Sequence, residues 1–148
     1  MTITILDKTK KEKFIEQLKV YGITSIPHLV IVTGKEKYRF FSGSLSRIEI
    51  EKMRGINLEG IGLYAAKQEG NEIRLTLDGI HLLKEQIRVY FELNDEQAKS
   101  WFLGQDIPIK TDKHGFIILK YKGDFIGCGK ASNGRITNFM PKERRIKS

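Results

Sequence analysis

The sequence has few of the residues that build disulfides, metal sites and active centres. Of its 148 residues, one is a cysteine, Cys128, and three are histidines. A single cysteine forms neither an intrachain disulfide nor a cysteine-based metal cluster, so we expect a reducing, cytoplasmic setting. His28, His81 and His114 are widely separated, with no second histidine at ligand spacing. We therefore expect no metal, no cofactor, no catalytic residue and no enzymatic activity.

Long apolar stretches are also missing. The longest runs, Ile26–Val32 and Phe116–Leu119, have the length of strands and are too short for a membrane-spanning helix. The residues after Met1 form neither a basic segment nor a secretory apolar region. We expect no membrane partner.

Acidic residues are fewer than basic residues, above all at the C-terminal end. The formal net charge is +8 and the isoelectric point is about 9.6. Residues 1–79 hold 13 basic and 10 acidic residues, whereas residues 130–148 hold six basic residues and one acid, Glu143. A basic domain of this size favours a polyanionic partner, although an excess of solvated lysine would give the same total.

The first half mixes strand and helix signals. Alternation at Thr2–Leu6 predicts a strand, and Asp7 is placed to cap a helix from Lys8 to about Tyr21 that ends at Gly22. The other expected elements are a hairpin of His28–Thr33 with Tyr38–Phe41, a helix from Ser46 to about Met53, a hairpin of Gly60–Ala66 with Glu72–Leu77, and a helical turn at Asp78–Lys84. A mixed α/β domain is predicted for residues 1–80.

The second half is dominated by strand signals. Ile87–Leu93 alternates and predicts a strand, and Asn94 or Asp95 is placed to cap a helix through Leu103 that closes at Gly104. The remaining elements are a polar loop at Asp106–His114, strands at Phe116–Lys120, Phe125–Ala131 and Arg135–Phe139, and a tail, Pro141–Ser148, too charged to pack. Residues 81–148 should form a second domain, and the fold class should be α+β.

The glycines around Cys128 do not form a nucleotide-binding loop. Gly127-Cys128-Gly129-Lys130 lies within a strand pattern, not at a strand-to-helix turn. Strict alternation would put Gly127 and Gly129 on the same face as Phe125, and Cys128 on the other face with Ile126. We expect both faces to be partly covered and Cys128 to be a buried, unreactive thiol.

The segment Gly123–Arg145 is the best candidate for a binding site. Glycines on a strand allow close approach, and basic residues next to Asn and an aromatic suit RNA better than an acidic protein. We expect phosphate contacts from Lys130, Arg135, Lys142, Arg144 and Arg145, and positioning of a strand or base by Asn138. Phe139 would stack on a base or, as we favour, close the core with Met140.

This segment resembles the PUA-like RNA-binding domain of Sun-type RNA cytosine-5 methyltransferases. The resemblance rests on Gly127-Cys128-Gly129-Lys130, the turn ending at Gly134-Arg135, and Asn138-Phe139-Met140-Pro141-Lys142-Glu143-Arg144-Arg145. Thr137 stands where the family often has a lysine, which weakens one expected phosphate contact. The match covers roughly Leu93–Ile146. More faintly, Gly60–Lys67 followed by Ile73–Gly79 resembles the pre-PUA domains of ribosome-biogenesis factors.

The resemblance implies a pre-PUA-like domain followed by a PUA-type β-pseudobarrel that binds rRNA or tRNA. It does not imply methyl transfer, because that reaction needs a cofactor domain and a cysteine pair. We expect a stand-alone accessory factor in RNA modification or ribosome biogenesis, acting beside a separate RNA methyltransferase. The alternatives are a protein-docking subunit of a methyltransferase or ribosome-assembly complex and a small-molecule enzyme, for which paired carboxylates and histidine clusters are missing.

Overall fold

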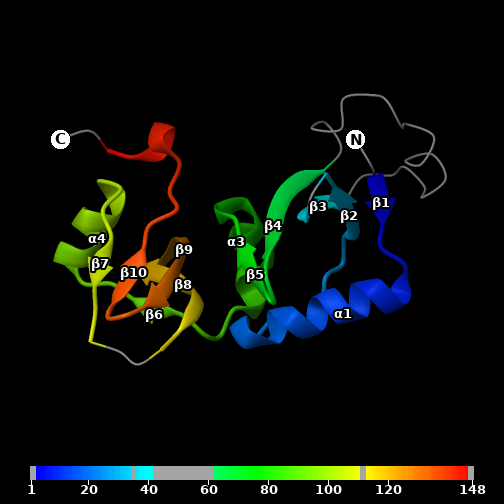
Figure 1. Ribbon diagram of the computed structural model, residues 1–148, viewed down its shortest axis with the longest axis horizontal. Helices are drawn as coiled ribbons and strands as arrows, with labels where there is room; N and C mark the ends of the chain where they lie inside the picture. Colours follow the sequence, from blue (N-terminus) through cyan, green and yellow to red (C-terminus); the bar gives the residue numbers. More distant parts are fainter. Residues whose placement is uncertain (1–2, 35, 42–61, 111–112, 147–148) are drawn as a thin grey trace.

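Two five-stranded sheets stand side by side along the long axis of the molecule (Figure 1). The computed structural model describes residues 3–34, 36–41, 62–110 and 113–146. The helix expected from Ser46 to about Met53 and the first two residues of the strand expected at Gly60–Ala66 lie outside these ranges. Helices and strands occur in both halves, which confirms the α+β class.

The first sheet is an antiparallel meander. Its strands follow one another in the order β1-β2-β3-β4-β5. They are β1 (Ile3–Ile5), β2 (Leu29–Thr33), β3 (Lys37–Phe41), β4 (Leu63–Glu69) and β5 (Glu72–Leu75). Both predicted hairpins are confirmed, because β2 pairs with β3 and β4 pairs with β5.

Helix α1 (Lys8–Leu18) supplies the main apolar cover of this sheet. Its start follows the predicted cap, since the Asp7 carboxylate accepts a hydrogen bond of 2.9 Å from the amide of Lys10. Phe14 and Leu18 are buried one helical turn apart and pack in the core with residues of β2 to β5. A 3₁₀ turn, η1 (Lys19–Tyr21), ends the helix at Gly22, where φ is +90°.

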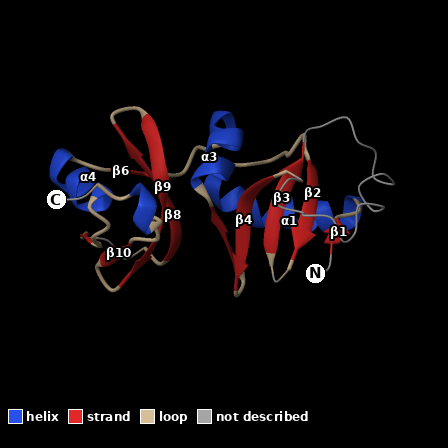
Figure 2. Cartoon of the chain, turned by 90° about the horizontal axis from the view of Figure 1, so that it is seen from above, coloured by secondary structure: helices blue, strands red, loops and turns tan. Residues whose placement is uncertain are grey.

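Helix α3 (Leu77–Leu83) lies between the two sheets (Figure 2). The Thr76 hydroxyl caps it by accepting a 3.0 Å hydrogen bond from the amide of Gly79. The helix packs on β4 of the first sheet and on β9 of the second, and η3 (Lys84–Gln86) follows it. The predicted domain boundary after residue 80 falls inside this shared helix and stays a prediction.

The second sheet curls into a half-barrel and has the order β6-β8-β9-β10-β7. Its strands are β6 (Phe91–Glu92), β7 (Ile107–Pro108), β8 (Gly115–Tyr121), β9 (Asp124–Ser132) and β10 (Arg135–Thr137). Strands β6 and β8 are parallel and the other pairs are antiparallel. Helix α4 (Asp95–Phe102) starts with a full capping box between Asn94 and Gln97, as the sequence predicts.

In this half, one predicted strand is too long and one predicted loop contains a strand. The strand expected at Ile87–Leu93 shrinks to β6, because the amides of Arg88 and Val89 donate to the carbonyl of Tyr21 and the segment crosses between the sheets. The loop expected at Asp106–His114 contains strand β7, and Ile107 in it is fully buried. In both places, contacts with distant residues outweigh the local pattern.

The tail is also more ordered than its charge predicts. A 3₁₀ turn, η4 (Lys142–Arg144), follows Pro141. The amide of Ile146 donates a 2.7 Å hydrogen bond to the carbonyl of Phe102, and the Arg145 side chain lies against Gly104. The expectation that Pro141–Ser148 does not pack is therefore wrong in part: most of the described residues to Ile146 are exposed, but Arg145 is half-buried and the hydrogen bond of Ile146 joins the segment to the end of α4.

A β-bulge reverses the predicted faces of strand β9. The register shifts between Leu119 and Lys120 on β8, so Phe125 pairs with Lys120 whereas Gly127 pairs with Leu119. Phe125 and Cys128 therefore face the first sheet, and Ile126 packs on the core of the second. The prediction that both faces are partly covered is confirmed, but the pairing of residues on each face was wrong.

Gly127 and Gly129 make room for the indole of Trp101. An added Cβ at Gly127 would lie 2.9 Å from Cζ2 of Trp101, and one at Gly129 would lie 2.9 Å from the carbonyl oxygen of Thr137 and overlap Ile136. Trp101 is the largest fully buried side chain of the described residues, so the glycines let α4 dock on the curled sheet.

Replacing Gly129 with alanine is expected to lower the free energy of unfolding by about 1–3 kcal/mol, because the added methyl group overpacks the Ile136 contact. Urea denaturation monitored by Trp101 fluorescence would measure the change. Lys130→Ala, one residue along the same strand and exposed, is the control and should leave the midpoint nearly unchanged. Equal midpoints for the two variants would contradict this account.

The two sheets share one hydrophobic core. The cluster around Phe14 and Leu18 of the first half also contains Ile118 of β8 and Cys128 of β9. A second cluster, around Trp101 and Leu119, belongs to the second sheet alone. A hydrogen bond from the amide of Phe116 to the Glu72 carboxylate, 3.3 Å long, adds a polar contact between the halves. The second sheet is thus held against the first by side chains on one of its faces.

Candidate nucleic-acid interface

Lys130 lies on an exposed row of the second sheet. It pairs with Phe116 of β8 on one side and with Thr137 of β10 on the other, so these three side chains share a face. The ammonium group of Lys130 lies 5.4 Å from the centre of the Phe116 ring. The predicted RNA contact at Lys130 is therefore a cation next to an aromatic ring at the surface.

This row continues into the first half of the molecule. The Phe116 and Phe139 ring centres are 5.9 Å apart, and the guanidinium carbon of Arg74 lies 5.1 Å from the centre of the Phe139 ring. Two neighbouring rings, Phe116 and Phe139, thus lie between the cations Lys130 and Arg74. We call these four residues the cation–aromatic row. Bases stack on such rings, and the cations neutralise phosphates.

Phe139 is 38% exposed and so does not close the core as we had favoured. The reason is the change of direction after β10: Met140, the next residue, packs on the second core cluster, and this leaves the Phe139 ring on the outside. Its exposure on a row flanked by arginine and lysine makes it available for stacking.

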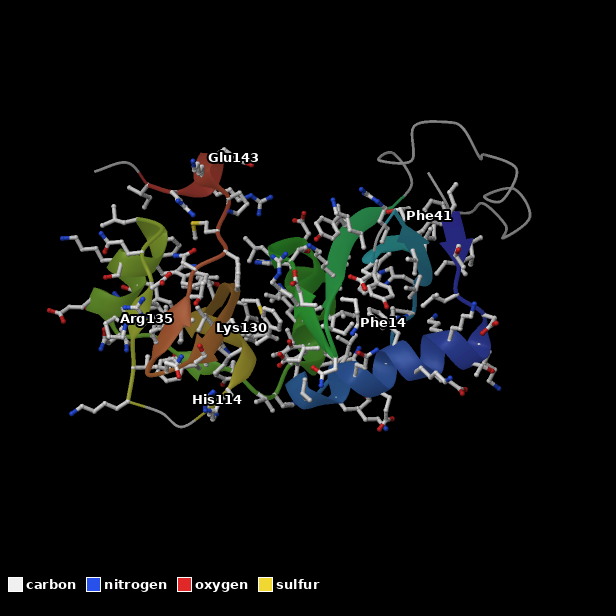
Figure 3. The ribbon with its side chains drawn as sticks, viewed as in Figure 1. Phe14, Phe41, His114, Lys130, Arg135 and Glu143 are labelled. Carbon is white, nitrogen blue, oxygen red and sulfur yellow. The ribbon has the colours of Figure 1, made fainter. Side chains whose placement is uncertain are left out.

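Lys142 and Arg144 project from the η4 turn. Both are exposed, and among the described residues neither side chain has a salt bridge. Glu143 lies between them in sequence, at the top of the second half in Figure 3. Unpaired, flexible cations of this kind suit phosphates, which need charge more than fixed geometry.

Arg135 shares the face of Lys130 but is partly neutralised. Its position opposite Ser132 puts it two residue pairs from Lys130 along β9 and β10 (Figure 3). Its guanidinium group lies 3.7 Å from the Asp106 carboxylate, and 63% of its side chain is exposed. The pair is exposed enough for a phosphate to compete with the aspartate.

Asn138 and Arg145 serve the fold. The side-chain amide of Asn138 donates to the carbonyls of Trp101 and Gln105, at 2.8 and 3.0 Å, and its oxygen accepts from the amide of Met140. Nε of Arg145 donates to the carbonyl of Met140 at 3.0 Å. Of the predicted positions, Lys130, Arg135, Lys142 and Arg144 are exposed, whereas these two hold the path of the chain between β10 and η4.

Arg74 is the residue of the row that the sequence gives no reason to choose. It lies on β5, outside the segment Gly123–Arg145, and its neighbours along the chain, Ile73 and Leu75, are apolar and buried. Only the packing of the two sheets brings it to Phe139. Phe116 was predicted only as the first residue of a strand, and its contact with Lys130 needs the strand pairing.

Cys128 is buried in the shared core, as predicted. Burial raises the pKa of its thiol to about 12, and burial also raises the pKa of the neighbouring Tyr21, whose hydroxyl donates to the carbonyl of Ile73. The thiolate is the nucleophilic form, so this cysteine is unsuited to covalent catalysis at neutral pH.

Cys128 is accordingly expected to react with Ellman's reagent at pH 8 roughly a thousandfold more slowly than in the unfolded chain, because the thiol pKa rises from 9.0 to about 12. The rate in buffer and the rate in guanidinium would be compared by absorbance. Fast reaction of the folded protein would show that the shared core opens readily and would contradict the packing of the two sheets.

The described residues contain no group of three or more His, Cys, Asp or Glu side chains placed to hold a metal ion. Among those same residues, no helix has the length and apolar character needed to cross a membrane.

Comparisons with known proteins match the C-terminal half most strongly. Residues 88–146 match the family model described as the methyltransferase RsmF PUA domain. Proteins called ribosomal RNA small subunit methyltransferase F are 44% identical over 52 residues in Aliivibrio fischeri (strain ATCC 700601 / ES114) and 40% identical over 53 residues in Vibrio cholerae (strain M66-2). Each match covers 35% of this chain and 11% of the relative.

One relative matches nearly the whole chain. The protein of that name from Photobacterium profundum is 29% identical over 144 residues, which is 95% of this chain and 29% of the relative. The chain thus spans less than a third of the length of this relative. Together with the half-barrel sheet, the comparisons place residues 88–146 in the family of RsmF-type PUA domains.

Proposed function

We propose that this protein binds structured RNA, rRNA in the first place or tRNA, through the cation–aromatic row and the η4 turn. The observation that carries the proposal is the pair of neighbouring rings, Phe116 and Phe139, between the cations Lys130 and Arg74. The exposed cations of η4 and Arg135 extend this row with phosphate-binding charge. The relatives' printed name, ribosomal RNA small subunit methyltransferase, supports rRNA as the target.

We infer that the chain contributes binding and not methyl transfer. Its sole cysteine is the buried, protonated Cys128, which does not suit a nucleophile. The protein would then act as an accessory factor in RNA modification or ribosome assembly, beside a separate RNA methyltransferase, in the cytoplasm.

A role in docking to a protein is the second candidate. Val20 and Val89 are 65% and 45% exposed, and the amide of Val89 donates to the carbonyl of Tyr21, next to Val20. These apolar side chains lie away from the cation–aromatic row and offer a small hydrophobic contact. Co-purification of another protein that survives nuclease treatment, and its loss in Val20→Ser with Val89→Ser, would favour this role.

The RNA test is fluorescence anisotropy with a labelled rRNA fragment and labelled tRNA at about 50 and about 200 mM salt. The triple variant Lys130→Ala, Lys142→Ala, Arg144→Ala removes three exposed cations and is expected to bind roughly 30-fold more weakly at the lower salt. The slope of log affinity against log salt should flatten by about 2–3, since each phosphate contact contributes about 0.7–0.9.

The control variant removes the same charge from the other end of the molecule. Lys8, Lys10 and Lys13 are exposed on α1, and alanine suits a helix at each position. The Lys8→Ala, Lys10→Ala, Lys13→Ala variant should keep most of the affinity. Equal losses in the two triple variants would mean that only total charge matters and would contradict the proposed site.

A further inference from the structure

A pocket opens between the two halves of the molecule, beside the cation–aromatic row. Its volume is about 430 Å³, within the range of roughly 300–1,000 Å³ that small ligands occupy. Side chains of β4, β5 and the start of α3 line one wall, and side chains of α4, β9 and the segment after β10 line the other. In Figure 1, α3 and β4 lie on the side of the first sheet, and β9 and the segment after β10 lie on the side of the second.

The floor of the pocket contains an unpaired hydrogen-bond donor. Trp101 lines the pocket and is 1% exposed, and its Nε1 has no hydrogen-bond partner among the described residues. Gly127, which also lines the pocket, packs directly against the indole: a Cβ at that position would lie 3.4 Å from Nε1. Buried donors are almost always paired in folded proteins, so an acceptor is missing at this point.

A second unpaired donor lies in the opposite wall. Nε of Arg74 is buried without a partner, whereas another nitrogen of the same guanidinium group lies 3.4 Å from the Glu69 carboxylate. Both unpaired groups, the indole N–H and the guanidinium N–H, donate and cannot accept. A ligand that satisfies them must present acceptors such as carbonyl oxygens.

The rim of the pocket is built for a flat, anionic molecule. Phe139 lines it with a ring that is 38% exposed and capped on one side by Arg74. Arg144 lines the rim as well and is exposed without a salt bridge among the described residues. An aromatic platform and an arginine at the opening, above buried donors, match the parts of a nucleotide: base, phosphate and carbonyl acceptors.

We propose that this pocket takes one unstacked base of the bound RNA, a base with a carbonyl acceptor, such as uracil. The base stacks against Phe139, its carbonyl oxygens accept from Nε1 of Trp101 and Nε of Arg74, and its phosphate lies near Arg144. The inference rests on the proposed RNA binding and goes beyond it, because the cation–aromatic row alone would bind RNA without reading a base. Adenine, which has no carbonyl, binds more weakly in the same place.

The chain has a single tryptophan, so the indole N–H of Trp101 gives one signal in a ¹H–¹⁵N spectrum of the full chain. Titration with uridine monophosphate is expected to shift this signal to saturation, and ribose 5-phosphate, which lacks the base, should leave it in place. A single-stranded RNA with unpaired uridines should shift the signal in the same direction at lower concentration. Phe139→Ala should weaken the nucleotide by about tenfold or more.

Phe139→Leu is the matched variant, because it keeps apolar bulk at the rim without a ring face, and it should behave like Phe139→Ala. The proposal is overturned if RNA binds with the expected salt dependence while the indole signal stays unmoved, a result that would leave the proposed RNA binding intact. A shift with uridine monophosphate but no RNA binding at low salt would overturn both, and would define a site for free nucleotides. Equal shifts with ribose 5-phosphate would also overturn it.

Discussion

Ile118→Asp is expected to unfold both halves of the protein together. Ile118 is fully buried on β8, opposite Cys128, in the cluster that joins the second sheet to Phe14 and Leu18 of the first half. A carboxylate there would be buried without a cation, at a cost of roughly 4 kcal/mol or more. That is a large share of the roughly 5–15 kcal/mol that stabilises a folded domain.

The milder variant Ile118→Ala makes the coupling measurable. It should lower the free energy of unfolding by about 2–5 kcal/mol. Urea denaturation would be followed by Trp101 fluorescence, which reports on the second sheet, and by hydrogen exchange of α1 amides, which reports on the first. The two signals should change at the same, lowered midpoint.

Leu119→Ala is the matched control for Ile118→Ala. Leu119 is also fully buried but points to the opposite face, into the cluster around Trp101. Leu119→Ala should lower the urea midpoint reported by Trp101 fluorescence by a similar amount. Its direct effect on the hydrogen-exchange protection of the α1 amides should be smaller. Unchanged protection of α1 amides in Ile118→Ala would show that the halves fold independently, which would restore the two separate domains expected from the sequence.

Asn138→Ala is expected to lower the free energy of unfolding by about 2–4 kcal/mol, because it removes three hydrogen bonds, to the carbonyls of Trp101 and Gln105 and from the amide of Met140, and leaves the Trp101 carbonyl with only the amide of Gly104. The melting temperature should fall by roughly 10 °C. Asn138→Asp should be at least as damaging, since an acceptor-only carboxylate would face two carbonyl oxygens. Differential scanning calorimetry would measure all three proteins.

The same change tests how Asn138 acts on RNA. The segment that it holds carries Phe139 and leads to Arg144, so loosening it should weaken RNA binding even though both side-chain N–H donations of Asn138 go to backbone carbonyls. Gln105→Ala, which keeps the backbone carbonyl and removes an exposed amide, is the control. A large loss of RNA affinity in Asn138→Ala without a change in melting temperature would show instead that Asn138 contacts RNA directly.

Local chemistry determined the elements that the sequence predicted well. The caps at Asp7 and Asn94, the positive-φ glycine at Gly22, and the β8–β9 hairpin depend on residues within a few positions of one another. Short-range hydrogen bonds and apolar spacing fix such features before any long-range packing forms. The motif segments of residues 127–145 were equally visible, and they led to the PUA family that the comparisons show.

Distant packing decided the rest. The bulge that puts Cys128 against the first sheet, the loss of strand pairing at Arg88 and Val89, and the burial of Ile107 all arise from contacts with residues far along the chain. The charges of the tail gave no sign that Arg145 and Ile146 would be fastened to the chain by hydrogen bonds.

The sequence by itself determined that the protein is basic, that its C-terminal half resembles a PUA domain, and that its single thiol is a poor nucleophile. Tertiary structure alone decided which cations lie beside the aromatic rings of the proposed RNA site. Arg74 meets Phe139 because α3 and the shared core set the two sheets side by side, and the pocket with the unpaired Trp101 nitrogen exists only between them. The physical reason is that stacking and hydrogen bonding act over a few ångströms, so a site built from both halves has no pattern in either one.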